Sequence, residues 1–299
     1  MFHIVDRKVQ PRPNEASSRR ANVGAMDPEP LHEALLYVAQ EALEGELHSL
    51  AGGAAAVCSM RCPGKESSNE DSAALIPAGD NAAVLVVADG VGGERAGAQA
   101  SEIAVRSLRE AVAQCDADEP ALRAAVLDGI ERANSAVQEL GIGAATTLAA
   151  VELCDGWARP YHVGDSMILV VGQRGRIKLQ TVAHSPVGFA LEAGMIDERD
   201  ALHHEERHVV SNVLGTSDMR IEVGSPLRLA QHDTLLIASD GLFDNLRIDE
   251  IVERIRKGPI ASCADRLSAD AQRRMTEPTP GEPSKPDDLS FVIFRLRRA

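Results

Sequence analysis

The sequence has few aromatic residues and no net positive charge. Aromatic side chains make up 3% of its 299 residues, so we expect an aliphatic core of Val, Leu, Ile and Ala. The formal net charge of −14 argues against a nucleic-acid partner, because proteins that bind nucleic acids usually present a basic surface. The excess of acid fits either a solvated surface or carboxylates gathered around cations. Only the positions of the acids distinguish these alternatives.

Ordered cysteine patterns and long apolar runs are also missing. The five cysteines are scattered and form no C-x-x-C pair, which favours a reducing compartment over a disulfide framework or a zinc site. No apolar run approaches the ~20 residues that a membrane-spanning helix needs. The first twenty residues lack the apolar segment of a secretory signal. We therefore expect a cytoplasmic protein without a membrane span.

Two regions are predicted along the chain. Residues 1–50 read as an N-terminal extension that is disordered at first and then helical, with Asp27 as N-cap, Pro28 in the first turn and apolar residues at helical spacing up to Leu50. Residues 51–299 read as the main domain. There, short strand-like runs come in groups, and helices are predicted in pairs at 94–115 and 119–140, and near 248–257 and 260–274. Such grouping predicts an α+β domain with antiparallel sheets flanked by helices.

Acidic residues recur where predicted strands meet loops. Two of them, Asp89 and Asp240, each end an apolar strand and precede a glycine. Mg²⁺ and Mn²⁺ prefer oxygen ligands, strand ends hold ligands rigidly, and a residue without Cβ such as Gly90 lets its carbonyl approach an ion. An Asp-Gly pair alone is most often an ordinary turn, so spacing leaves a metal site and plain turns as equal alternatives. The residues concerned are Glu70, Asp71, Asp89, Asp240, Asp287 and Asp288.

Six short motifs in order resemble those of the metal-dependent protein serine/threonine phosphatases, the PPM or type 2C family. They are NED, VADGVGG, GAATTL, HVGDS, ASDGLFDNL and PDDLSFVI, and the resemblance covers roughly residues 54–299. Residues 184–215 are further similar to the mobile flap of bacterial members, and we expect the flap histidines to be surface groups or substrate contacts. The resemblance implies a four-layer α/β/β/α sandwich, with a central antiparallel β-sandwich flanked by helix pairs.

The resemblance also implies an activity and a ligand set. The activity is hydrolysis of phosphoserine and phosphothreonine in phosphoprotein substrates, by a water that bridges two Mg²⁺ or Mn²⁺ ions. Asp89 would bridge both ions, and the carbonyl of Gly90 and the side chain of Glu70 would bind the second. Asp240 and Asp287 would hold the first ion, and with Asp89 they form the expected catalytic set.

Three further acids have expected roles around these ligands. Asp71 and Asp288 would orient ligands or bound waters from outside the coordination shell. Asp165 resembles a position that helps to hold a third, weaker ion, and its alternative is a plain turn between two strands.

The sequence departs from the family pattern in two places. Glu66 stands where many members have an arginine that grips the substrate phosphate, so Lys65 or Arg61 would take that role. Val91 stands where some members have a histidine that protonates the leaving group. These departures keep open a catalytically weak pseudophosphatase that acts as an interaction module. A third possibility is an enzyme of the same fold that acts on a phosphoserine in a partner-switching pathway. The intact acids favour an active phosphatase.

Overall fold

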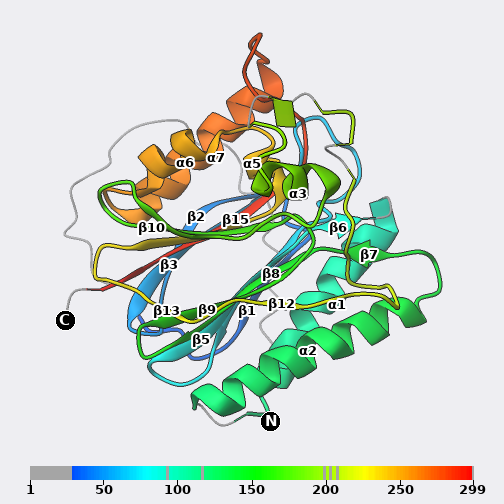
Figure 1. Ribbon diagram of the computed structural model, residues 1–299. Coiled ribbons are helices and arrows are strands. Elements are labelled where there is room, and N and C mark those ends of the chain that lie inside the picture. The colour runs from blue at the N-terminus through cyan, green and yellow to red at the C-terminus, as the bar shows by residue number, and fades with distance from the viewer. Residues whose placement is uncertain are drawn as a thin grey trace, which may run out of the picture.

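The computed structural model describes residues 29–91, 94–115, 118–197, 200–201, 204–206 and 209–297. Two antiparallel sheets lie face to face at its centre (Figure 1). In the described part of the chain, the first sheet has the strand order β1-β4-β5-β8-β9-β12, and β13 also pairs with β9. Its strands are β1 (Leu35–Val38), β4 (Ser72–Pro77), β5 (Ala82–Ala88), β8 (Leu148–Cys154), β9 (Trp157–Val163), β12 (Glu222–Val223) and β13 (Leu227–Arg228).

The second sheet has the order β11-β10-β14-β15-β3-β2, and a short pair, β6 with β7, stands apart. The central strands are rich in aliphatic residues, and β5 and β14 are buried along their whole length, which explains why they form strands. The bounds are β2 (Ala42–Leu50), β3 (Gly53–Met60), β10 (Met167–Val171), β11 (Ile177–Gln180), β14 (Thr234–Ala238), β15 (Leu289–Leu296), β6 (Gly90–Val91) and β7 (Ala145–Thr146).

Helices cover the outer faces of both sheets (Figure 1). α1 and α2 pack on the first sheet through one aliphatic core, and α6 and α7 pack on the second sheet through another. A third core fills the space between the sheets. The four-layer sandwich and both predicted helix pairs are therefore confirmed. The helix bounds are α1 (Glu94–Val112), α2 (Glu119–Glu139), α3 (Pro186–Glu192), α5 (Asp240–Phe243), α6 (Ile248–Ile255) and α7 (Ile260–Thr276). None of the helices in the described residues has the length and apolar character needed to cross a bilayer.

The helix predicted between Asp27 and Leu50 is wrong. Asp27 and Pro28 lie outside the described residues, and the segment after them forms β1 and β2. Strand pairing overrides the helical spacing, because positive φ values break the segment at two points. β1 ends just before Ala39, which has a φ of 49°, and the pairing of β2 shifts register at Gly45, which has a φ of 55°. These interruptions bring apolar residues into register with β4 and β3, at a spacing that a helix also fits.

The predicted boundary at residue 50 divides both sheets. β1 pairs with β4 in the first sheet, and β2 pairs with β3 in the second. Tyr37 of β1 lies in the core between the sheets with 6% of its surface exposed, and its hydroxyl is 2.7 Å from Nε2 of His48 on β2. We therefore place the start of the domain before β1.

Tyr37→Ala tests whether this segment belongs to the domain. We expect the free energy of unfolding to fall by about 3 kcal/mol, because the substitution leaves a cavity between the sheets and removes the contact with His48. Leu47→Ala, at a position that is 37% exposed, is the control and should cost less than 1 kcal/mol, roughly the value for a surface change. Equal small losses in urea denaturation would show that residues 29–50 are an appendage.

Candidate metal centre

Asp89 stands where β5 leaves the core. β5 is buried along its whole length, and Asp89 follows directly, at the same end of the sandwich as the loop that carries Glu70. Thr147 fixes this end: its backbone N–H donates to the Asp89 carbonyl at 2.8 Å, and its side-chain Oγ1 accepts from the Asp89 amide at 3.2 Å. Hydrogen bonds to both the amide and the carbonyl thus fix the backbone of Asp89, independently of any contact that its carboxylate makes.

The glycine after Asp89 allows a close approach of three segments. A Cβ on Gly90 would lie 2.4 Å from the carbonyl oxygen of Gly97 on α1 and 2.8 Å from that of Glu70. A Cβ on Gly97 would lie 2.7 Å from Oε1 of Glu70. Bare backbone is therefore required at both glycines because the Glu70 loop packs against α1 and β6.

A second group of acids converges from the other sheet. Asp240 begins α5 two residues after β14 ends, and Asp287 lies two residues before β15 begins. A Cβ on Gly241 would lie 1.9 Å from the carbonyl oxygen of Asp288, so only glycine lets these two segments pack together. The Asp-Gly pairs at 89 and 240 thus act alike: each lets a neighbouring chain segment approach the acid.

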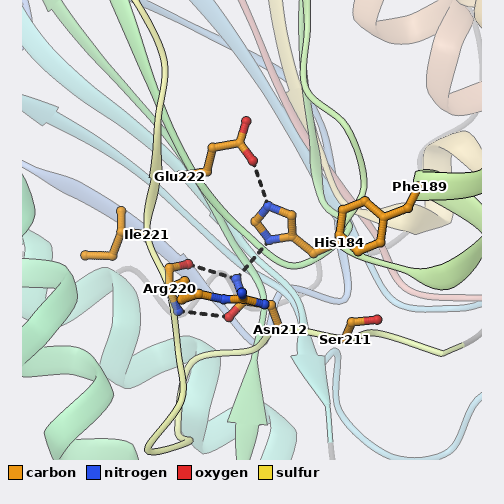
Figure 2. Close-up of a pocket in the computed structure, with 7 residues that line it drawn as sticks. All are labelled: His184, Phe189, Ser211, Asn212, Arg220, Ile221 and Glu222. Atoms are coloured by element: carbon orange, nitrogen blue, oxygen red, sulfur yellow. Dashed lines mark hydrogen bonds and ion pairs between the residues drawn. The ribbon is translucent and has the colours of Figure 1, made fainter. Parts of the chain in front are cut away.

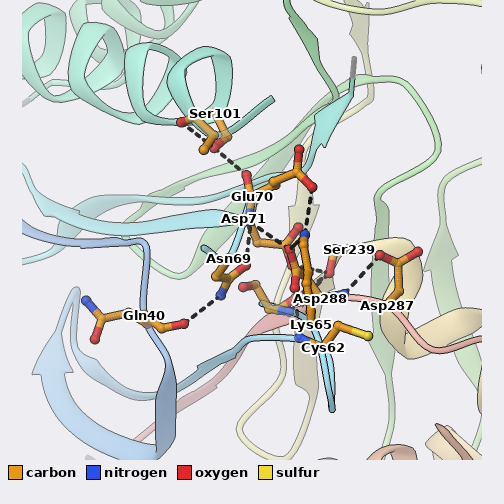
Figure 3. Close-up of polar contacts among 12 residues, drawn as sticks. Gln40, Cys62, Lys65, Asn69, Glu70, Asp71, Ser101, Ser239, Asp287 and Asp288 are labelled. Carbon is orange, nitrogen blue, oxygen red and sulfur yellow. Dashed lines mark hydrogen bonds and ion pairs between the residues drawn. The ribbon is translucent and has the colours of Figure 1, made fainter. Parts of the chain in front are cut away.

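Asp288 organises the neighbouring loop from a buried position (Figure 3). Its Oδ1 accepts from the Cys62 amide at 2.8 Å, and its Oδ2 accepts from the Glu70 amide at 2.7 Å and from the Lys65 ammonium at 2.6 Å. Lys65 also donates to Oε2 of Glu70 at 2.6 Å. Asp288 therefore sets the position of Glu70 through both its backbone and Lys65.

Asp71 is buried beside Asp288 and is held from the second sheet. Its Oδ2 accepts from the hydroxyl of Ser239 at 2.8 Å, and its amide donates to Oδ1 of Asn69 (Figure 3). Burial raises the pKa of Asp71 well above its usual range, and the charge of Asp288 adds to this effect. Asp71 thus ties the Glu70 loop to the strand that delivers Asp240.

Lys285 and Asp244 join the centre although the sequence analysis missed both. The Lys285 ammonium is 2.7 Å from Asp240, 2.8 Å from Asp244 and 2.9 Å from Asp287. The spacing of Asp244, four residues after Asp240 on the same helical turn, is a signal that could have identified it. Lys285 lies in a proline-rich loop, where the sequence does not indicate in which direction the side chain points.

Asp165 faces the same group of acids from the turn between β9 and β10. Burial, together with the charges of Asp240 and Asp244, raises its pKa to about 7, and Lys285 opposes that shift. The structure therefore brings the third-ion candidate beside Asp240, although the same position also serves as a turn between strands.

The donor set fits divalent cations. Oε1 of Glu70 is buried and has no hydrogen-bond partner among the described residues. The pKa of Asp89 is raised well above its usual range, by burial first and then by the charges of Asp71, Asp240, Asp165 and Asp287. Hard divalent cations prefer oxygen ligands. They would bind the unpartnered oxygen of Glu70 and offset the repulsion between Asp89 and its acidic neighbours.

Comparison with known proteins agrees with this geometry. The Protein phosphatase 2C family matches residues 61–274. The chain belongs to the protein phosphatase 2C (PPM) family. It is 31% identical over 199 residues to the serine/threonine phosphatase stp of Listeria monocytogenes, an alignment that covers 63% of this chain and 77% of that protein.

Solved structures show the same relationship. The S. agalactiae serine/threonine phosphatase superposes with a TM-score of 0.71 at 26% identity, covering 81% of this chain and 99% of that one. The catalytic domain of PstP, solved in complex with two manganese ions, superposes with a TM-score of 0.63 at 27% identity, covering 82% and 98%. The chain is accordingly a metal-dependent serine/threonine protein phosphatase of the PPM family, with divalent metal ions as its cofactors.

The two departures from the family pattern lie near the centre of this phosphatase. Glu66 is exposed, and Lys65 beside it points to Glu70 and Asp288 instead of to solvent. Val91 is 36% exposed on β6, directly after the glycine that packs against Glu70. The structure offers an ammonium near the first position and no titratable group at the second.

His184 attaches the flap-like segment to the turn that carries Asp165, and this corrects its expected surface position. It is 7% exposed, and Figure 2 shows its ring between Glu222 and Asn212. Its amide donates to the carbonyl of Gly164 at 2.8 Å, and its Nδ1 accepts from the Gly164 amide at 3.1 Å and from the Asn212 amide group at 2.9 Å. His184 therefore fixes the residue before Asp165. His203 and His208 lie outside the described residues.

The same contacts set the tautomer of His184. Asn212 is oriented by its bonds with the backbone of Arg220, so it presents N–H to Nδ1. The proton must then be on Nε2, which lies 2.9 Å from Oε2 of Glu222. A cavity of about 300 Å³ opens beside this pair, and Figure 2 shows the residues that line it.

This tautomer disfavours a second metal site. Among the described residues, His162, His184 and Glu222 have ligand atoms within 4.8 Å of one another. A metal-bound histidine needs a free nitrogen lone pair and usually donates from its other nitrogen. His184 has no free lone pair, because Nδ1 already accepts two hydrogen bonds and Nε2 keeps the proton that it donates to Glu222. The hydrogen bonds of His184 therefore attach the flap-like segment to the β-sandwich.

His162 gives the phosphatase a distinctive response to acid. It is 1% exposed, and its ring centroid is 4.2 Å from that of His184. On the neighbouring strand β12, Glu222 lies opposite His162 in the antiparallel register. Burial, with a smaller effect from His184, lowers the pKa of His162 to about 3. The unfolded chain, where the pKa is roughly 6.5, therefore binds a proton that the folded chain rejects, and stability falls as the pH drops below about 6.5.

His162→Leu should remove this loss. Between pH 6 and pH 5 the wild type should lose about 1 kcal/mol of unfolding free energy that the variant keeps, measured by urea denaturation. His232→Leu, at an exposed position, is the control and should keep the wild-type slope. If all three proteins have parallel pH profiles, His162 is protonated equally in the folded and unfolded states.

Proposed function

We propose that this phosphatase hydrolyses phosphoserine and phosphothreonine in proteins at a centre of two Mg²⁺ or Mn²⁺ ions. Asp89 would bridge the ions, Glu70 and the Gly90 carbonyl would complete one shell, and Asp240 and Asp287 would complete the other. The observation that carries the proposal is the convergence of these carboxylates from four separate segments of the chain. The raised pKa of Asp89 supports it, because carboxylates that repel one another need cations between them.

Each protein group has a defined task in this proposal. When bound, the ions lower the pKa of water towards ~7 and neutralise charge on the phosphoryl oxygens. Asp71 and Asp288 hold the ligand-bearing loops through Ser239, Lys65 and the Glu70 amide. The rigid strand ends of β5 and β14 keep the ligands in place while substrate binds and leaves.

Lys65 is the best-placed cation for the substrate phosphate. Its ammonium has three donors, and the contacts with Glu70 and Asp288 use two of them. Burial alone would lower the pKa of Lys65, but its bonds to Asp288 and Glu70 outweigh burial and raise it, so the group stays charged. We assign the third donor to the phosphate. Val91 cannot donate a proton, so the leaving oxygen takes its proton from water.

Asp165 is assigned to a third and weaker ion. Its position beside Asp240 and its pKa of about 7 support this role, because a carboxylate that is partly protonated at neutral pH binds a cation less firmly. The turn that it occupies is held by His184, so the flap-like segment and this ion would be linked.

An inactive pseudophosphatase is the alternative. Glu66 and Val91 favour it, because each replaces a residue that other members use for catalysis. The full set of ligands and their close-packed glycines disfavour it, since an interaction module has no need for a cluster of repelling acids.

Asp89→Asn tests the proposal. We expect kcat/KM for a phosphothreonine peptide with Mn²⁺ to fall about 1000-fold, equivalent to about 4 kcal/mol of transition-state stabilisation. The melting temperature of the metal-free variant should not fall, because the substitution removes a buried and repelled charge. Asp128→Asn, on the exposed face of α2, is the matched control and should keep full activity. Wild type that turns over no substrate with Mn²⁺ at any pH between about 7 and 9 would support the pseudophosphatase.

A further inference from the structure

Lys285 is the most heavily engaged cation at the centre. It comes from the loop between α7 and β15, and its ammonium lies within 2.9 Å of a carboxylate oxygen of Asp240, Asp244 and Asp287. Its backbone amide also donates to Oδ1 of Asn245 at 2.9 Å, so the loop is anchored beside α5. The side chain is therefore built into the centre and does not reach it from a mobile surface position.

The charge of Lys285 is firmly held. Burial alone would lower its pKa, but the charges of Asp240, Asp244 and Asp287 outweigh burial and raise it. The ammonium also lowers the pKa of Asp287 and Asp165, which burial and their acidic neighbours raise. Lys285 thus neutralises part of the charge that would otherwise attract a divalent ion.

The carboxylates that Lys285 contacts overlap with the proposed metal ligands. Asp240 and Asp287 are the pair assigned to the first ion, and Asp244 lies one helical turn after Asp240. Lys65, in comparison, contacts Glu70 and the outer acid Asp288. A positive charge held against both ligands of one ion repels that ion and competes for the same oxygen atoms.

We propose that Lys285 is a resident cation that holds Asp240 and Asp287 together without metal and competes with the divalent ion for them. The inference rests on the metal centre proposed above. Lys285 would make the site formed by Asp240 and Asp287 bind its ion more weakly than these ligands alone would, and it would keep the metal-free centre assembled. Metal binding would turn the ammonium away from at least one of the two carboxylates.

Two quantities move in opposite directions under this proposal. Lys285→Met should lower the melting temperature of the metal-free protein, because three carboxylates lose their shared counter-charge. The same variant should bind Mn²⁺ at least tenfold more tightly, equivalent to about 1.4 kcal/mol. A residue that only supports the fold would lower stability and leave metal affinity unchanged or weaker.

Isothermal titration with Mn²⁺ and thermal melting in EDTA measure these quantities on the full chain. Lys285→Arg, which keeps the charge, should stay within about threefold of the wild-type affinity. Lys178→Met is the matched control, since Lys178 makes a 2.6 Å contact with a single carboxylate, Asp233, away from the centre. It should lower the melting temperature and leave Mn²⁺ affinity unchanged. Lys285→Gln replaces the Met variant if that variant does not fold without metal.

The outcomes separate this inference from the proposed function. If the wild type binds no Mn²⁺, or if Asp89→Asn binds it equally well, the proposed centre itself is wrong. If Asp89→Asn loses binding but neither Lys285→Met nor Lys285→Gln tightens it, the competition by Lys285 is overturned and the centre stands. A rise in KM for the phosphopeptide with unchanged Mn²⁺ affinity would instead make Lys285 a substrate contact.

Discussion

The mutual repulsion of acids at one end of the sandwich is the constraint on which the rest of the structure depends. Burial raises the pKa values of Asp71, Asp89, Asp165 and Asp287, and the charges of neighbouring acids, Asp240 among them, raise these pKa values further. A folded chain tolerates this only if the acids are rigidly held and cations offset their charge. The strand ends supply the first condition, and the two lysines with the divalent ions of the family supply the second.

Close backbone packing is how the fold brings these acids together. Gly90, Gly97 and Gly241 each stand where a Cβ would overlap a neighbouring segment. Thr147, which lies between β7 and β8, holds the backbone of Asp89, and its Oγ1 lies 2.6 Å from the hydroxyl of Ser166 beside Asp165. A single threonine thus connects the bridging ligand with the third-ion turn. His184 extends this connection into the flap-like segment.

The sequence was sufficient to predict the elements whose pattern is local and repeated. The four helices on the outer faces, the strand before Asp89 and the strand before Asp240 follow from apolar runs and helical stripes. The helix predicted over 27–50 failed because Ala39 and Gly45 take positive φ values that no periodicity reveals. Lys285 could not be predicted because its role depends on the path of a proline-rich loop. The partners of His184 likewise come from residues far apart in the chain.

Anomalous diffraction from crystals of this phosphatase soaked with Mn²⁺ tests the central claim most directly. The account predicts two strong manganese peaks on either side of the Asp89 carboxylate, one next to Glu70 and the Gly90 carbonyl and the other next to Asp240 and Asp287. It would be contradicted by the absence of manganese at Asp89, or by manganese bound instead between His162, His184 and Glu222.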